Sequence, residues 1–399
     1  MNSPTATNHK MKLAVVTSYF PTAQEIYRGH SAFHTLRNMP EEASIQVFCP
    51  LASYPRAKWL NSRRFRYYPP DLNYQPPGLR TTYFTYPALP LVSRPFNGLT
   101  CAHHLKPLLV DYRPDLILSY SVYPEGFSAL RIGQQLGVPV IVVSIGSDLR
   151  RIDFLTTLLV RYTVKRSAAV ITVSEELRGR AIRLGVPPDR VITILNGFDA
   201  SVFHPGDRAA ARRELGLPAD WELVLFTGSV TPEKGLAEFM DAIIALSATR
   251  PRLQVALIGE GGYTAEMKRY VAEKGHAERF RFLGRQTSAQ VAAWMTACDI
   301  FCLPSHSEGC PNVVVEALAT GRPVVATAVG GIPEMVNEKC GMLVPAKDTQ
   351  KLQEAIDLAL GRLWDQEQIA GLFQRGWKEV ARETYEVCRR VIDHRAFGK

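Results

Sequence analysis

Short runs of apolar residues alternate along the chain with longer segments in which apolar positions recur at helical spacing. The first pair is the run 12–17 and the helical pattern at 31–39. Parallel strands joined by crossover helices produce such alternation, because each strand is buried on both faces and each helix on one. Further strands of the first half are expected at 45–49, 116–119, 138–144, 170–173 and 191–195, with helices at 127–136 and 175–184.

A second series of the same kind follows the segment PGDRAAARRELGLPADW at 205–221. Its strands are expected at 223–227, 255–258, 280–283, 300–303, 324–326 and 342–344. Two series predict two doubly wound α/β domains in tandem, each a Rossmann-like parallel sheet covered by helices. Because open parallel sheets bind ligands beyond the carboxyl ends of their strands, two facing sheets are expected to enclose an interdomain cleft that holds the chemistry.

The boundary between the domains is expected in the turn-rich segment 196–205, which has no clear period. We predict a disordered tail over 1–10, a first domain over 11–200 and a second domain over 201–377. The last helix, 378–399, is expected to pack back on the first domain.

Composition and length narrow the class of protein. A chain of 399 residues exceeds one ordinary hydrophobic core, and 46% hydrophobic with 21% charged residues excludes a disordered protein. No stretch approaches the roughly 18 apolar residues that span a bilayer. The first ten residues are polar and show no secretory signal, so the sequence predicts a cytoplasmic protein.

The net charge of +9 comes from the first half of the chain. Residues 1–205 hold 23 of the 47 Lys and Arg but only 13 of the 38 Asp and Glu. Within them, 54–96 interleaves basic and aromatic residues among prolines, with Arg63, Arg64 and Arg66 close together. This composition favours an anionic surface such as a membrane, whereas no nucleic-acid-binding motif accompanies it. A solvated surface loop is the alternative.

The seven cysteines are too few and too dispersed for a disulfide framework. Cys298 and Cys302 suggest a metal site, but both flank an apolar run and no further ligands lie near them in the sequence. We therefore expect buried thiols and no metal.

The most informative stretch runs from Pro304 to Glu334 and reads as strand, loop, short helix, strand and glycine turn. A helix that begins at Pro311 or Asn312, directly after a strand, offers unpaired backbone N–H groups to an anion such as diphosphate. Two carboxylates, Glu308 and Glu316, accompany this anion site. They are suited to accepting hydrogen bonds from the hydroxyls of a sugar or a ribose.

Two further segments lie at the carboxyl ends of expected strands. In GSVTPEKG, Lys234 can reach a phosphate as a point charge, although a solvated lysine is the alternative. In LIGEGG, Gly259 and Glu260 resemble a nucleotide-binding glycine turn, although such glycines often only make the turn.

Taken together, these segments resemble the retaining glycosyltransferases of family 4, which have the GT-B fold of two facing Rossmann-like domains. The resemblance rests on Glu308 and Glu316 in SEGCPNVVVEALATGRPVVAT, with VGGIPE, PEKG, LIGEG and FLG in order over the second half. The first half resembles the family more loosely, through TVSEELRGRAIRLGVPPDRVITILNGFD, GSD and the glycine-containing loop SYFPTAQEIYRGH.

The resemblance implies roles for individual residues. Glu308 would bind the transferred sugar, Glu316 the ribose, and Lys234 would offset charge on the departing diphosphate. The nucleotide-sugar site implied in the second domain also includes Gly228, Ser229, Gly259, Glu260, Gly284, Arg285, Gly309, Cys310, Pro311, Asn312 and Val313. The first domain would bind the acceptor, with Gly29, His30, Tyr123, Glu125 and Asp148 as candidates and helix capping as the alternative for Glu125 and Asp148.

Two positions depart from the family pattern. Ser229 stands where the family usually has an arginine that contacts the diphosphate, and Ile145 stands where a histidine often precedes GSD. Basic residues that would substitute for the arginine are Arg28, Arg150 and Arg285.

The resemblance implies a retaining, metal-independent glycosyltransferase whose co-substrate is a nucleoside-diphosphate-sugar. The expected acceptor is a lipid-linked glycan of exopolysaccharide, capsule or cell-envelope synthesis, reached by peripheral association with the inner face of the membrane. Two alternatives remain open, namely a sugar-nucleotide epimerase or hydrolase of the same fold and a catalytically silent subunit that binds nucleotide sugar as a scaffold. The sequence names neither the sugar nor the base.

Overall fold

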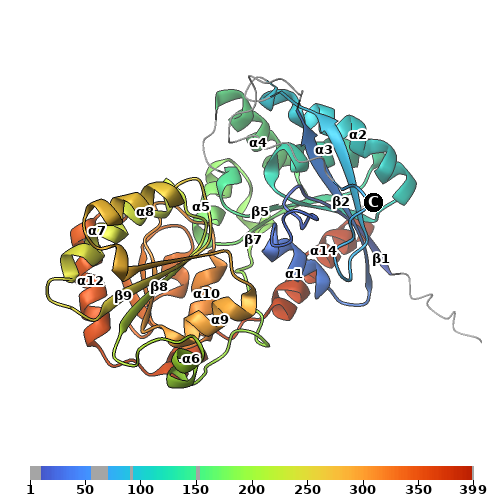
Figure 1. Ribbon diagram of the computed structural model, residues 1–399. Helices are drawn as coiled ribbons and strands as arrows, with labels where there is room; N and C mark the ends of the chain where they lie inside the picture. Colours follow the sequence, from blue (N-terminus) through green and yellow to red (C-terminus); the bar gives the residue numbers. More distant parts are fainter. Residues whose placement is uncertain (1–9, 55–70, 90–92, 150–152, 398–399) are drawn as a thin grey trace, which may run out of the picture. The chain divides into compact units, whose positions relative to one another are not determined.

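The computed structural model describes residues 10–54, 71–89, 93–149 and 153–397. The chain divides into two compact units, the first formed by 1–195 with 377–399 and the second by 196–376. Each unit is built on a parallel sheet (Figure 1). The two Rossmann-like α/β domains expected from the alternating pattern are thereby confirmed.

The first unit contains a seven-stranded sheet in the order β3-β2-β1-β4-β5-β6-β7. Every pair of neighbouring strands in it is parallel. The strands are β1 (Met11–Val16), β2 (Ala43–Ser53), β3 (Thr81–Pro87), β4 (Leu116–Tyr120), β5 (Val140–Ser144), β6 (Ala169–Thr172) and β7 (Val191–Thr193).

Helices and short turns (η) connect these strands. They are α1 (His30–Arg37), η2 (Arg94–Phe96), α2 (Asn97–Tyr112), η3 (Val122–Gly126), α3 (Phe127–Leu136), η4 (Ser147–Leu149), α4 (Phe154–Arg166), α5 (Glu175–Arg183), η5 (Pro188–Arg190) and the last helix α14 (Trp377–Phe397). The end of the chain belongs to this unit, because α14 packs against α1, where Trp377 stacks on His34 with ring centroids 5.6 Å apart (Figure 1).

The second unit contains a six-stranded parallel sheet in the order β10-β9-β8-β11-β12-β13. Its strands are β8 (Glu222–Thr227), β9 (Leu253–Ile258), β10 (Phe280–Gly284), β11 (Ile300–Leu303), β12 (Val324–Thr327) and β13 (Gly341–Val344). Its helices and turns are α6 (Arg208–Glu214), η6 (Pro232–Lys234), α7 (Leu236–Leu246), α8 (Thr264–Glu273), η7 (Ala277–Arg279), α9 (Ser288–Ala297), α10 (Asn312–Ala319), α11 (Ile332–Met335), α12 (Thr349–Gly361) and α13 (Gln366–Leu372).

In each sheet all strands run parallel, but the order of the strands reverses at one point, called the reversal. Counted within its own unit, each begins in the order 3-2-1-4-5-6 of a doubly wound nucleotide-binding fold. The reversal lies between β1 and β4 in the first unit and between β8 and β11 in the second. The loops that leave these strands diverge to opposite sides of the sheet, which opens a crevice where ligands of such folds bind.

The basic and aromatic segment 54–96 contains an element that the sequence did not predict. Thr81–Pro87 forms β3, which pairs with β2 at the edge of the first sheet. Its β-branched and aromatic residues, TTYFTYP, favour an extended strand despite the surrounding prolines. The interpretation of the whole segment as a surface loop is therefore wrong for 81–87. Arg63, Arg64, Arg66 and Arg150 lie outside the described residues.

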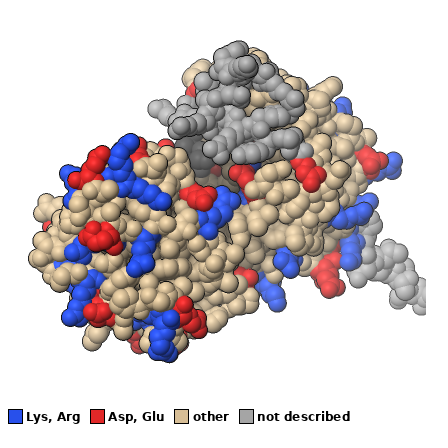
Figure 2. All heavy atoms as spheres, in the orientation of Figure 1, with Lys and Arg blue, Asp and Glu red and all other residues tan. Residues whose placement is uncertain are grey.

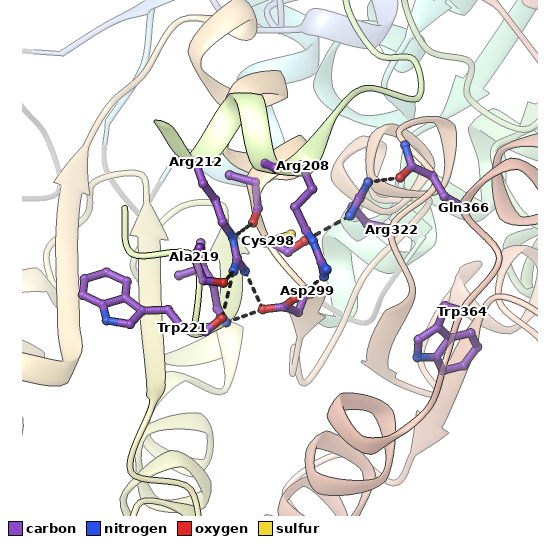
Figure 3. A network of polar contacts seen from close by, with 12 residues as sticks. Arg208, Arg212, Ala219, Trp221, Cys298, Asp299, Arg322, Trp364 and Gln366 are labelled. Atoms are coloured by element: carbon purple, nitrogen blue, oxygen red, sulfur yellow. Dashed lines mark hydrogen bonds and ion pairs between the residues drawn. The ribbon is translucent and has the colours of Figure 1, made fainter. Parts of the chain in front are cut away.

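A polar network fastens the amino-terminal ends of the strands in the second unit (Figure 3). Asp299, just before β11, accepts from Arg212 Nη2 at 2.7 Å and from the Leu223 amide at 2.7 Å, and it also pairs with Arg208. Arg212 is 4% exposed, and its other donors reach the carbonyls of Ala297, Ala219 and Trp221. The network therefore joins α6 to β8 and β11 at the amino-terminal ends of the strands, opposite the expected ligand crevice.

Charges of both signs are interspersed on the molecular face drawn in Figure 2, where Lys and Arg lie among Asp and Glu over much of the described surface. No helix of the described residues is long and apolar enough to cross a membrane.

Candidate active site

The second unit brings Lys234 and Glu308 together at the reversal of its sheet. Lys234 ends η6 after β8, whereas Glu308 lies in the loop after β11. Lys234 Nζ donates to Glu308 Oε1 at 2.6 Å, and the two side chains are 21% and 11% exposed. Because both side chains are largely buried, this charge-assisted hydrogen bond holds both groups in a defined orientation.

Gly235 makes this meeting possible. It adopts a left-handed conformation with φ of 65°, and a Cβ there would lie 2.0 Å from the Pro304 carbonyl oxygen at the end of β11. Only glycine allows both the conformation and the close approach. The turn after β8 therefore rests directly on the loop that bears Glu308.

The glycine turn after β12 supports the Glu308 loop from another side. A Cβ on Gly330 would lie 2.1 Å from the Glu308 carbonyl oxygen, and the Gly331 amide donates to the Gly309 carbonyl at 2.6 Å. The VGG motif thus fixes the backbone of Glu308 and Gly309.

Helix α10 begins directly after this loop, as the sequence predicted. Its N-cap is Pro311, whose side chain can satisfy none of the amides of the first turn. Asn196 Nδ2 donates to the Cys310 carbonyl at 2.9 Å and to Asn312 Oδ1 at 2.8 Å, which anchors the start of the helix. Sequence reasoning missed this role of Asn196, because it treated 196–205 only as a domain boundary.

Cys310 contributes only backbone to the surface of this loop. Its thiol is buried, lies 3.8 Å from the Met335 sulfur, and has its pKa raised by burial to about 12. The side chain belongs to the core of the second unit. Its neighbours Gly309 and Val313 are partly exposed, and their backbone atoms flank the helix start.

Glu316 lies in the second turn of α10 and is 8% exposed. Burial raises the pKa of its carboxyl group to about 7, and no hydrogen bond or ion pair of that group is found among the described residues. A buried carboxyl group without a partner is costly unless a ligand supplies hydrogen-bond donors. Such a group is suited to receive hydroxyls.

The glycines expected at the nucleotide converge at the carboxyl ends of β8, β9 and β10. The Gly228 amide donates to the Ile258 carbonyl at 2.9 Å, and the Gly259 amide donates to the Gly284 carbonyl at 2.8 Å. A Cβ on Gly259 would lie 1.8 Å from the Gly228 carbonyl oxygen. Ser229, Glu260 and Arg285, the polar residues of these turns, are all exposed.

One side-chain contact near the site has no counterpart in the sequence reasoning. His306 Nε2 lies 2.9 Å from Glu238 Oε1 of α7, and the His306 amide donates to the Glu233 carbonyl at 2.8 Å. Both side chains are 23% exposed. This pair links the loop of Glu308 to η6 and α7 beside Lys234. Because the two residues are 68 positions apart in the sequence, no local pattern indicated their contact.

In the first unit, Gly29 and His30 begin α1 after the loop that follows β1. Gly29 has φ of 67°, and a Cβ there would lie 1.9 Å from the Tyr19 carbonyl oxygen. The ring of His30 contacts Trp377 with centroids 5.9 Å apart. The position after β1 places both residues at the reversal of the first sheet.

Tyr123 and Glu125 lie in η3, directly after β4. The Tyr123 hydroxyl donates to the Arg94 carbonyl at 2.6 Å and accepts from the Gly98 amide at 3.2 Å. Glu125 is 2% exposed; burial raises its pKa, and hydrogen bonds from Ser18 oppose that shift. Among the described residues, its Oε2 has no hydrogen-bond partner. Tyr123 thus anchors α2, whereas Glu125 ties η3 to the loop after β1.

Asp148 connects two other loops at the same edge. Its carboxylate accepts from Ser144 Oγ at 2.8 Å, the Gly146 amide at 3.1 Å and the Val122 amide at 3.2 Å. Burial raises the pKa of Asp148 despite these bonds. Because every bond holds backbone or β5 in place, the side chain shapes the loops after β4 and β5.

All seven cysteines are free thiols that lie buried. Among the described residues, no three or more His, Cys, Asp or Glu side chains gather in a way that would hold a metal ion. The raised pKa values of Cys298 and Cys302, which burial causes, fit thiols of the core.

Two family profiles match the chain, one in each unit. Residues 222–362 match "Glycosyl transferases group 1", and residues 33–197 match "Glycosyl transferase 4-like domain". The chain therefore belongs to the family 4-like glycosyltransferases, with the GT-B fold.

Individual relatives agree with this class. The teichuronic acid biosynthesis glycosyltransferase TuaC of Bacillus subtilis, whose function is itself inferred, is 28% identical over 96% of this chain and 95% of its own. D-inositol 3-phosphate glycosyltransferase of Mycobacteroides abscessus is 38% identical over 44% of this chain and 40% of its own.

Solved structures share the fold over nearly the whole chain. Sucrose-phosphate synthase of Thermosynechococcus elongatus has a TM-score of 0.76 at 22% identity, covering 96% of this chain and 100% of its own. Anabaena HepE in complex with UDP-glucose has a TM-score of 0.68 at 19% identity, covering 97% and 99%.

Proposed function

We propose that this protein transfers a sugar from a nucleoside-diphosphate-sugar to a glycan acceptor, with retention of the anomeric configuration. The observation that carries the proposal is the 2.6 Å contact between Lys234 and Glu308 beside the start of α10, at the reversal of the second sheet. A cation, a carboxylate and a helix N-terminus at one point match the charged diphosphate and the hydroxyl-bearing sugar of such a donor.

The acceptor is proposed from the relatives and from the charge of the first half. TuaC is named for teichuronic acid biosynthesis and aligns along nearly the entire chain. We place this protein in the synthesis of an exopolysaccharide, capsule or other cell-envelope polysaccharide. A lipid-linked acceptor at the inner face of the membrane would suit the excess of Lys and Arg in residues 1–205.

Each residue of the site then has a task. The amides from Gly309 to Val313 bind the distal phosphate at the start of α10, and Lys234 binds the same diphosphate. Glu308 accepts hydrogen bonds from the sugar, and Glu316 accepts them from the ribose. The turns that carry Gly228, Gly259 and Gly284 receive the nucleoside, as proposed for the family pattern.

In the transfer step, the acceptor hydroxyl oxygen attacks the anomeric carbon on the face from which the diphosphate leaves. The bond between that carbon and the phosphate oxygen breaks, and its electron pair stays with the oxygen. The same phosphate oxygen takes the proton of the acceptor hydroxyl, which balances the reaction without a protein base. Lys234 and the helix start stabilise the charge on the leaving diphosphate, the role that a divalent metal has elsewhere.

Donor consumption measured with and without acceptor tests this proposal. UDP-, GDP- and ADP-sugars are first compared by thermal shift, and the stabilising donor is then incubated with lipid-linked glycan. Nucleoside diphosphate release that requires acceptor, with a product of unchanged anomeric configuration by NMR, is expected.

The other outcomes identify the alternatives. Free sugar released without acceptor would indicate a hydrolase or an epimerase of the same fold. Stabilisation by a donor without any turnover would indicate a silent scaffold subunit. A product of inverted configuration would overturn the retaining mechanism and leave the transferase assignment standing.

A further inference from the structure

Helix α4 of the first unit presents an unusual surface to solvent. Its buried face consists of Thr156, Val160, Thr163 and Val164. On the outer face, Phe154, Leu155 and Leu158 are 77%, 54% and 46% exposed, and Arg161, Lys165 and Arg166 follow them, also exposed. The thirteen residues of α4 include no Asp or Glu. The helix is thus apolar at its first turn and basic at its last.

The turn η2 adds to the apolar end of this surface. Phe96 is 60% exposed, and Arg94 Nε lies 4.0 Å from Asp153 Oδ2 at the start of α4. Asp153 also caps the helix by accepting from the Thr156 amide at 2.8 Å. The carboxylate of Asp153, next to Phe154, therefore already interacts with a guanidinium and a backbone amide.

Aromatic rings fix η2 and α4 to each other. The Tyr123 hydroxyl holds the Arg94 carbonyl at 2.6 Å, and Tyr123 packs on Phe127 with ring centroids 6.0 Å apart. Phe127 packs in turn on Tyr162 of α4, also at 6.0 Å. Phe96 and the outer face of α4 therefore belong to one preformed surface.

We propose that this surface, defined as Phe96, Phe154, Leu155, Leu158, Arg161 and Lys165 and called the α4 face, docks the protein on anionic phospholipid. Exposed aromatic and aliphatic side chains enter the boundary between headgroups and acyl chains, while Arg and Lys pair with lipid phosphates. The centre of a protein interface is, by contrast, depleted of Lys. The charge of the α4 face complements an anionic bilayer.

The inference rests on the proposed function, because only a lipid-linked acceptor requires the enzyme to reach a membrane. It also explains where the surface lies. Helix α4 packs against η3, the turn that bears Glu125 and follows β4 at the reversal of the first sheet. The apolar end of the α4 face is therefore on the side of the sheet where the acceptor candidates gather.

Vesicle flotation tests the α4 face without donor or acceptor. The full chain is mixed with vesicles of phosphatidylglycerol and phosphatidylethanolamine, or of phosphatidylcholine alone, at low and high salt. We expect the parent to float with the anionic vesicles and to bind phosphatidylcholine at least tenfold less. High salt should weaken the binding, because the Debye length falls from about 30 Å at 0.01 M to about 3 Å at 1 M salt.

Two variants separate the apolar and basic contributions, and each has a matched control in the second unit. Phe154→Ser with Leu155→Ser and Leu158→Ser should lower vesicle binding at least tenfold at every salt concentration. Arg161→Glu with Lys165→Glu should lower it mainly at low salt. The controls, Leu358→Ser with Leu363→Ser and Lys339→Glu with Lys347→Glu, change exposed residues and should bind like the parent. Circular dichroism confirms that each variant is folded.

The outcomes distinguish the docking surface from the proposed function. No binding by the parent, or equal loss in variants and controls, would overturn the α4 face even if sugar transfer to a water-soluble acceptor proceeds. Normal vesicle binding with no transfer to any acceptor would overturn the proposed function and leave the docking surface standing. A dimer in sedimentation that the serine variant dissociates would show that the face covers a second copy, which also overturns the inference.

Discussion

Lys234 and Glu308 neutralise each other in a part of the second unit that water reaches poorly. A bound donor would offer Lys234 a more negative partner and Glu308 a set of sugar hydroxyls, so both groups would keep their charge satisfied through the reaction. Under the proposed function, the pair would exchange one hydrogen bond for several when the donor enters. Because these contacts would strengthen as charge builds on the diphosphate, they would act on the transition state.

Replacing Glu308 tests this role. Glu308→Ala should lower turnover by about 10²-fold or more, as loss of a transition-state contact does, while the melting temperature changes little. Steady-state kinetics with the identified donor and acceptor provide the measurement. Glu367→Gln, which changes an exposed carboxylate of α13, is the control and should behave like the parent. Unchanged turnover in the Glu308 variant would remove the sugar site from this loop.

Glu316 should make the stability of the second unit depend on pH. Its folded pKa of about 7 lies above the ordinary value of 4.5, so the folded state binds the proton more tightly than the unfolded state. The stabilisation is present below pH 4.5 and is lost as pH rises to about 7, by up to about 3 kcal/mol. Urea unfolding between pH 5 and 8 should show this decline in the parent.

Glu316→Gln removes the titrating group and keeps the shape. The variant should lose less stability than the parent between pH 5 and 8. A decline of the same size in both would assign the pH dependence to other groups. If the ribose assignment holds, the variant should also bind UDP-glucose or the identified donor more weakly, because an amide accepts fewer hydrogen bonds than a carboxylate.

At the scale of elements, the two ends of the strands in the second sheet differ in function. The carboxyl ends of β8 and β11 carry the candidate site, whereas their amino-terminal ends are fastened by Asp299 and Arg212 (Figure 3). Stability and ligand binding should therefore respond to different substitutions.

Asp299→Ala would leave the guanidinium of Arg212 buried without its carboxylate. We expect the unfolding free energy of the second unit to fall by about 3 kcal/mol, because breaking a buried pair leaves an uncompensated charge. Arg208→Ala is the control, since Arg208 is 51% exposed and its loss should cost less than about 1 kcal/mol. Urea unfolding followed by hydrogen exchange in α6 and β11 provides the measurement. Equal effects of both substitutions would contradict this account.

The hydrophobic pattern predicted most strands because each is a short apolar run buried on both faces. The strand at 300–303 and the helix at 127–136 were predicted at their observed bounds. The edge strand β3 was missed, because it is only half buried and lies among prolines and arginines that suggest a loop. The hydrophobic pattern also did not predict short turns such as η2 and η3, because these depend on tertiary contacts like that of Tyr123 with Arg94.

The candidate site was predictable where backbone and charge coincide in one motif. Glu308, Glu316 and the start of α10 follow each other within nine residues, so their common location could be inferred from the sequence. The contact between His306 and Glu238, the anchoring by Asn196 and the burial of Glu316 could not. Each depends on which side chains distant segments bring together, and a single sequence does not encode that in any local period.

At the scale of the whole molecule, the same doubly wound order occurs in both units, and in each a pair of candidate residues follows the two strands that flank the reversal. Glu308 and Lys234 do so in the second unit, and His30 and Glu125 do so in the first. Because the same architecture is repeated, the chain has two candidate binding sites, one at the carboxyl ends of the strands in each unit. It also predicts that donor and acceptor act on different parts of the chain.

Hydrogen exchange with and without donor tests that division. At 100 times its dissociation constant, a ligand stabilises the state that binds it by about 2.7 kcal/mol, which slows exchange through opening of its site by about 100-fold. With UDP-glucose or the donor identified by thermal shift, we expect the strongest protection at 228–235 and 305–316. Protection confined to the loops after β1 and β4 would instead place the nucleotide in the first unit. That result would reverse the assignment of donor and acceptor to the two domains, while the family and the fold would stand.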